Sequence, residues 1–138
     1  MSDVSDEALT DDALIKAALE ARDKAYAPYS NYRVGCAVLA GGELFVGANV
    51  ENASYGLAMC AERCATAVAV NAGHRRLDAV VVATDSSPPA APCGMCRQTL
   101  NEFARGDLRI IVVNPAGERV DFTLAELFPA GFSGDQLT

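Results

Sequence analysis

The chain has 138 residues, 51% of them hydrophobic, which is sufficient for a single domain over residues 1–138 with a buried core. Its 18 acidic residues outnumber 11 basic residues and give a net charge of −7, which argues against a nucleic acid as partner. No apolar run approaches the roughly 20 residues of a membrane span, so we expect no association with a membrane.

The first part of the chain predicts a helix followed by a β-hairpin. Thr10 can cap the helix, in which apolar residues recur at helical spacing as far as Ala25, before Pro28 ends it. A strand over residues 32–40 and a returning strand over residues 43–48 follow, joined by a pair of glycines.

The remainder of the chain alternates helices with strands. We predict helices over about 60–72 and 94–103, strands over 77–84, 109–113 and 118–122, and a short last helix that begins with a capping box at Thr123. The strand over 77–84 is almost entirely Ala and Val, as expected where both faces are covered. This order predicts an α/β fold, a three-layer α/β/α sandwich with a five-stranded mixed sheet.

Three cysteines and one glutamate stand at the start of the two middle helices. Cys60 and the pair Cys93 and Cys96 can supply three ligands to one Zn²⁺ per chain, which leaves the fourth tetrahedral position for water. Glu62 lies two residues from a ligand, so its carboxylate can face that water and transfer its protons without binding the metal. This spacing therefore predicts a catalytic zinc site.

The charge of such a site suggests a role for Arg63. Zinc with three thiolates carries a net charge of −1, and Arg63 is placed to donate hydrogen bonds to those thiolates. Cys64 leaves a second interpretation open, because a fourth cysteine would close the site and make the protein a non-catalytic, zinc-stabilised interaction module. Alternatively, Cys64 is simply a small buried hydrophobic residue.

The compartment is inferred from the cysteines and the N-terminus. Five cysteines, an odd number that includes a Cys-x-x-Cys pair, indicate metal or redox chemistry in a reducing environment. The acidic N-terminus has neither the basic start nor the apolar stretch of a signal peptide. We therefore expect a cytoplasmic protein.

Together with these motifs, four further segments give the chain a resemblance to a known family. Residues 27–35, 47–56, 92–98 and 127–132 resemble, in this order, those of the small homotetrameric, zinc-dependent cytidine deaminases. The resemblance implies hydrolytic deamination of cytidine and 2′-deoxycytidine, small nucleosides, to uridine and 2′-deoxyuridine with release of ammonia. The alternative hypothesis is a related deaminase that acts on another aminopyrimidine compound or on RNA, although the acidic charge argues against RNA.

The resemblance also implies which residues bind the nucleoside. Asn49 and Glu51 would hold a ribose hydroxyl, and the backbone of Ala61 would contact the amide edge of the base. Tyr32 matches a position where the family usually has phenylalanine against the pyrimidine, and its additional hydroxyl requires a polar partner or water. Ordinary turn chemistry for Asn49 and a place in the core for Tyr32 are the plainer interpretations.

Two aromatic residues are implied to act across subunits. Phe132 would close over the base of a neighbouring chain, and Tyr55 would likewise be contributed to a neighbour. The expected assembly is therefore a homotetramer whose active sites are shared between subunits. The plainer alternative is that Phe132 is a core aromatic residue of its own chain.

Overall fold

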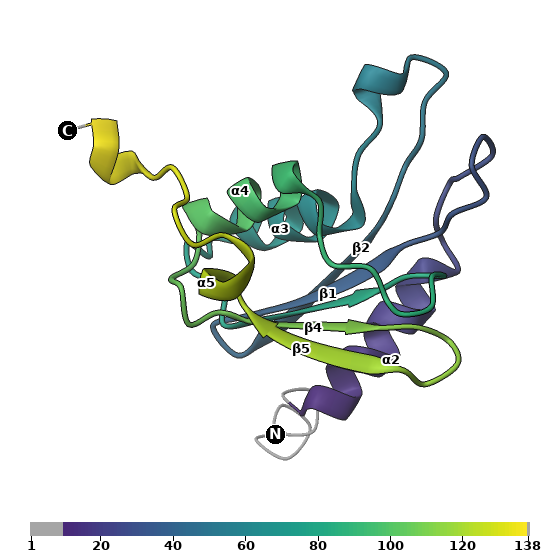
Figure 1. The fold of residues 1–138 in the computed structure, drawn as a ribbon, viewed down its shortest axis with the longest axis horizontal. Coiled ribbons are helices and arrows are strands. Elements are labelled where there is room, and N and C mark those ends of the chain that lie inside the picture. Colours follow the sequence, from purple (N-terminus) through teal and green to yellow (C-terminus); the bar gives the residue numbers. More distant parts are fainter. Residues whose placement is uncertain (1–9, 138) are drawn as a thin grey trace.

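The computed structural model describes residues 10–137, which form one five-stranded sheet with helices on both of its faces (Figure 1). The elements are α2 (Asp11–Arg22), β1 (Gly35–Ala40), β2 (Glu43–Ala48), η1 (Tyr55–Leu57), α3 (Ala61–Asn71), β3 (Ala79–Ala83), α4 (Gly94–Glu102), β4 (Arg109–Val113), β5 (Arg119–Thr123), α5 (Leu124–Leu127) and η2 (Gly134–Leu137). The acidic N-terminal residues, from which we argued against a signal peptide, lie outside the described part. Within that part, no helix is long and apolar enough to cross a membrane.

The sheet has the strand order β2-β1-β3-β4-β5. Only β3 and β4 pair in parallel, with Val81 opposite Ile111, while the other three pairs are antiparallel. A parallel pair requires a crossover, and α4 with its flanking loops provides it. The predicted mixed sheet within an α/β/α sandwich is thereby confirmed.

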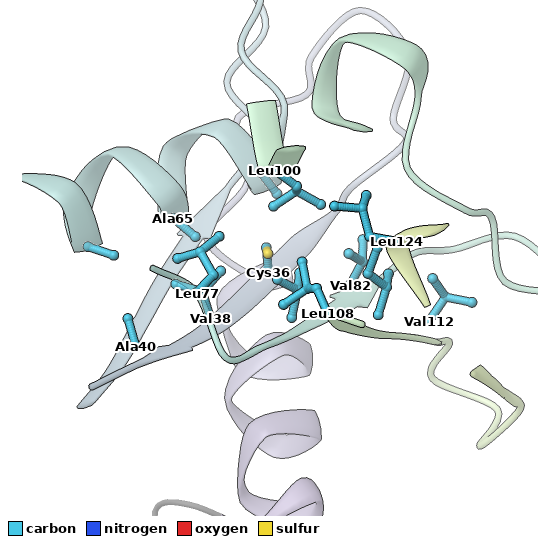
Figure 2. Close-up of a cluster of buried hydrophobic side chains, with 14 residues drawn as sticks. Cys36, Val38, Ala40, Ala65, Leu77, Val82, Leu100, Leu108, Val112 and Leu124 are labelled. Carbon is cyan, nitrogen blue, oxygen red and sulfur yellow. The ribbon is translucent and has the colours of Figure 1, made fainter. Parts of the chain in front are cut away.

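The two faces of the sheet bury separate hydrophobic clusters. Ala37, Val81 and Ile111 point to the face that α2 covers. Their neighbours in the strands, such as Val38 and Val82, point to the opposite face, where α3 and α4 pack (Figure 2). Because alternate side chains of a strand face opposite ways, the central strand β3 must be apolar at every position, and all of it is buried.

Two glycines allow the helices to approach the sheet closely. A Cβ atom on Gly35 would lie 2.1 Å from the carbonyl oxygen of Ala18 in α2. A Cβ atom on Gly47 would lie 2.6 Å from the amide nitrogen of Ala65 in α3. Both contacts are with backbone atoms, so neither helix could keep its place against a larger residue.

The two predicted boundaries that differ most from the structure both lie in the segment between α2 and β1. The first helix ends at Arg22, earlier than Ala25, and β1 begins only at Gly35, so Tyr32 precedes the strand. Tertiary hydrogen bonds explain the difference: Tyr26 exchanges backbone hydrogen bonds with the segment that follows β2, through the Asn49 carbonyl oxygen and the Glu51 amide. The predicted capping box at Thr123, in contrast, is present.

We expect Gly47→Ala to destabilise the protein, because the added methyl group would push α3 away from β2. The free energy of unfolding, measured by urea denaturation, should fall by about 1–3 kcal/mol, as for other overpacked positions. Gly56→Ala is the matched control, since a Cβ atom on Gly56 would meet nothing within 4 Å. Equal stability of the two variants would contradict the close approach described for α3.

Candidate active site

The three predicted metal ligands meet where the N-termini of α3 and α4 converge. Cys60 is the N-cap residue of α3, Cys93 is the N-cap residue of α4, and Cys96 lies in the first turn of α4. Their Sγ atoms all lie within 4.8 Å of one another. Helix N-termini favour negative charge, which suits a cluster of thiolates.

The spacing of the sulfur atoms fits a tetrahedral metal. Zinc–sulfur bonds of about 2.3 Å at tetrahedral angles place two sulfur atoms about 3.8 Å apart. The Sγ atoms of Cys60 and Cys93 are 3.9 Å apart. Among residues 10–137, Cys60, Cys93 and Cys96 form the one group of three or more His, Cys, Asp or Glu side chains close enough to hold a metal ion. Cys64 is not part of this group. A closed four-cysteine site is therefore not formed, and Cys64 instead packs near Gly47.

The thiols of the cluster differ in acidity. Hydrogen bonds from Cys96 and Cys93, together with the charge of Arg63, lower the pKa of Cys60 to about 5. The hydrogen bond to Cys60 and burial raise the pKa of Cys96. Cys60 is thus a far more acidic thiol than Cys96, and a metal ion that binds all three sulfurs would displace the protons that remain on them.

Glu62 lies in the first turn of α3, beside the cluster, and is only 5% exposed. Burial raises the pKa of its carboxyl to about 7, and the negative charge of Cys60 also raises it. A carboxyl with such a pKa exchanges its proton readily near neutral pH, which is the property required of a general acid and base.

Arg63, in the first turn of α3, is partly buried. Its Nη2 donates a 2.8 Å hydrogen bond to the carbonyl oxygen of Ala58, and its charge and hydrogen bonding act on Cys60. Its Nε atom is buried without a hydrogen-bond partner among the described residues. The guanidinium is therefore anchored next to the thiolates, where compensation of their charge is needed.

A cavity of about 270 Å³ opens beside the cluster. It brings together most of the predicted site residues, namely Tyr32, Asn49, Glu51, Cys60, Ala61, Glu62 and Cys93. These residues come from the loop before β1, the segment between β2 and α3, the start of α3 and the N-cap of α4. The cavity therefore lies at the end of the sheet where Gly35 pairs with Ala48 and Ala83.

Asn49 and Glu51 both hold the loop that precedes β1. The Oδ1 atom of Asn49 accepts a 2.8 Å hydrogen bond from the Val34 amide, and its Nδ2 donates to the Tyr32 carbonyl oxygen at 2.9 Å. Glu51 accepts hydrogen bonds from the amides of Tyr29 and Ser30 and from the Ser30 hydroxyl, which lowers its pKa. The two Asn49 hydrogen bonds join residues far apart in the sequence and do not close a local turn; together with those of Glu51 they fix both side chains in the cavity wall.

Tyr55 and Phe132 are not among the residues that line the cavity of their own chain. Tyr55 is 79% exposed and touches Tyr29 edge-on, with ring centroids 6.3 Å apart. Phe132 is 53% exposed, and its carbonyl oxygen accepts hydrogen bonds from two side chains of α4. The plainer interpretation of Phe132 as a core residue is therefore wrong.

No prediction from the sequence covered the polar part of the cavity wall at Thr84, which Ser86 supports. Thr84, only 3% exposed, lines the cavity at the end of β3. The Oγ atom of Ser86 lies 3.1 Å from Thr84 Oγ1 and accepts a 3.0 Å hydrogen bond from the Tyr32 hydroxyl. A buried threonine directly after a run of Ala and Val was the available signal for this wall.

Comparisons with known proteins bear on this geometry. Residues 9–113 match the family described as the cytidine and deoxycytidylate deaminase zinc-binding region. A cytidine deaminase of Halalkalibacterium halodurans is 42% identical over 125 residues, which are 90% of this chain and 95% of the relative. A cytidine deaminase of Mycobacterium tuberculosis is 39% identical over 87% of each chain.

Solved structures show the same similarity. A cytidine deaminase from Burkholderia pseudomallei superposes with a TM-score of 0.86 at 45% identity, over 90% of this chain and all of that one. A cytidine deaminase from Mycobacterium leprae gives a TM-score of 0.73 at 45% identity, over 86% of this chain and 96% of the other. Since the family match spans most of the chain and the relatives are covered nearly end to end, the chain belongs to the zinc-dependent cytidine and deoxycytidylate deaminase family.

Proposed function

We propose that this enzyme hydrolyses cytidine and 2′-deoxycytidine to uridine and 2′-deoxyuridine, with release of ammonia, in pyrimidine salvage. One observation carries the proposal: the zinc-binding sulfur cluster and the buried Glu62 share a cavity with Asn49 and Glu51. The sulfur cluster and Glu62 suit hydrolytic chemistry. Asn49 and Glu51 suit recognition of a sugar hydroxyl.

The reaction replaces the amino group at C4 of the base with oxygen from water. Cys60, Cys93 and Cys96 would hold the zinc ion, which would supply Lewis acidity and lower the pKa of water to about 7. Glu62 accepts a proton from the attacking water and delivers it to N3 of the base. It then carries the second proton to the amino group, which leaves as ammonia. Arg63 compensates the charge of the thiolates throughout.

The walls of the cavity fit a nucleoside. Asn49 and Glu51 bind a ribose hydroxyl, the ring of Tyr32 lies against the pyrimidine, and the backbone of Ala61 contacts the amide edge of the base. The net charge of −7 disfavours a polyanionic substrate such as RNA. A site that binds a sugar hydroxyl also rejects free cytosine, which would leave Glu51 without its partner.

The active assembly is a homotetramer of single-domain chains in the cytoplasm. Exposure of Tyr55 and Phe132, outside the cavity of their own chain, supports their contribution to a neighbouring site. Both hydrophobic clusters pack on the same sheet, which supports a single domain. All five cysteines are free thiols, which suits a reducing compartment.

Purified protein should bind one zinc per chain, and Cys93→Ala should lose it, because two thiolates retain the metal far less well than three. Cys64→Ala is the matched control and should keep its zinc, since Cys64 is not part of the sulfur cluster. Metal analysis of the dialysed proteins distinguishes these outcomes. Depletion of zinc in the Cys64 variant would favour a closed structural site instead.

The wild-type protein should decrease the ultraviolet absorbance of a cytidine solution as uridine forms. Glu62→Gln should retain zinc and fold but lose turnover by about 10²-fold or more, because an amide cannot transfer protons. A wild-type preparation with full zinc and no cytidine turnover would refute the proposed function. Activity of the Glu62 variant within a few fold of wild type would remove Glu62 from the mechanism.

Sharing of active sites can be tested by mixing two inactive variants. Phe132→Ala chains keep a sound zinc site, and Glu62→Gln chains keep an intact aromatic lid. After dissociation and reassembly, mixed oligomers should regain activity at sites that combine Glu62 of one chain with Phe132 of the other. Proven mixed oligomers without regained activity, or an active monomer in sedimentation, would argue against sharing.

A further inference from the structure

The Tyr32 side chain forms a connection across the cavity that the proposed chemistry does not use. Its hydroxyl donates a 3.0 Å hydrogen bond to the Oγ atom of Ser86, in the loop between β3 and α4. Tyr32 and the loop residues Ala90 and Ala91 line the same cavity. The hydrogen bond thus joins two walls of the cavity that are 54 residues apart in the sequence.

Ser86 is a fixed anchor for this hydroxyl. Its Oγ atom shares a 3.1 Å hydrogen bond with Thr84, whose own oxygen accepts a hydrogen bond from the Ala90 amide. Its carbonyl oxygen accepts a 3.1 Å hydrogen bond from the Nδ2 atom of Asn114, a residue only 3% exposed. The loop is therefore held at both the side chain and the backbone of Ser86.

The backbone of Tyr32 is also fixed by hydrogen bonds. Its amide donates a 3.0 Å hydrogen bond to the Ser30 hydroxyl, and its carbonyl oxygen accepts from Asn49. Ser30 in turn is bound to Glu51. Tyr32 therefore extends as a rigid bridge from the side chains assigned to the sugar to the loop that leads to Cys93.

We propose that the hydrogen bond from the Tyr32 hydroxyl to Ser86 acts as a clasp that determines substrate specificity. By holding two walls of the cavity together, the clasp limits the space available to the pyrimidine. This inference rests on the proposed function and names the feature of the base to which the cavity responds. A larger base such as 5-methylcytosine fills more of the cavity that these walls enclose, and it therefore requires them to separate. The clasp opposes that separation, so it favours cytidine over 5-methylcytidine.

The clasp can be removed from either side without loss of the aromatic ring. Tyr32→Phe and Ser86→Ala should each raise the KM for cytidine about three- to tenfold, the usual range for loss of one hydrogen bond, and leave kcat nearly unchanged. Each should also lower the preference for cytidine over 5-methylcytidine, measured as the ratio of kcat/KM values. The double variant should resemble either single variant, because both remove the same hydrogen bond.

Matched controls separate the clasp from general damage to the loops. Ser87→Ala removes the neighbouring hydroxyl, which binds Glu118 instead, and Tyr26→Phe removes a tyrosine hydroxyl outside the cavity. Both should keep the wild-type KM and preference, and Ser86→Thr should retain the clasp. Thermal unfolding confirms that every variant is folded.

The possible failures are distinguishable. Suppose that the wild type is active but its Tyr32 and Ser86 variants keep the wild-type KM and substrate preference. This result would overturn the clasp alone, and so would a double variant that shows the product of the two single effects. A zinc-loaded wild type that turns over neither nucleoside overturns the proposed function, and the clasp with it.

Discussion

The convergence of the N-termini of α3 and α4 is the constraint on which the rest of the site depends. It brings sulfur atoms from two distant segments within 4.8 Å of one another, and it orients Glu62 beside them. The approach is possible because three of the five buried residues of α3 are alanines (Ala61, Ala65 and Ala69) and the helix packs on Gly47. Larger residues there would tilt the helix, and Cys60 at its end would leave the cluster.

The same arrangement also compensates the negative charge of the sulfur cluster. A cluster of thiolates is unfavourable in a chain of net charge −7 unless positive groups lie close to it. Two helix N-termini and the anchored guanidinium of Arg63 supply that compensation. Burial meanwhile raises the pKa of Glu62 to about 7, so its carboxyl is only partly ionised near neutral pH. The metal site and the proton carrier are therefore compatible neighbours.

The sequence allowed prediction of the features that depend on local pattern. The spacing of Cys60, Cys93 and Cys96 predicted a cluster that the fold forms, and the apolar run of β3 predicted a strand covered on both faces. The segment between α2 and β1 could not be predicted, because its path is set by hydrogen bonds with residues far along the chain. Tyr32 illustrates this: alternation placed it in a strand, whereas Asn49, Ser30 and Ser86 hold it in the cavity wall.

The C-terminal segment has an unusual point of attachment. The Phe132 carbonyl oxygen is bound by Gln98 and Asn101 of α4, and Arg97 of the same helix joins the carbonyl oxygens of Leu127 and Pro92. The tail, which extends away from the sheet in Figure 1, is thus fastened to the helix that carries two of the sulfur ligands. A shift of α4 would therefore move Phe132 together with Cys93 and Cys96. The position of the C-terminal tail is thus coupled to the positions of the sulfur ligands.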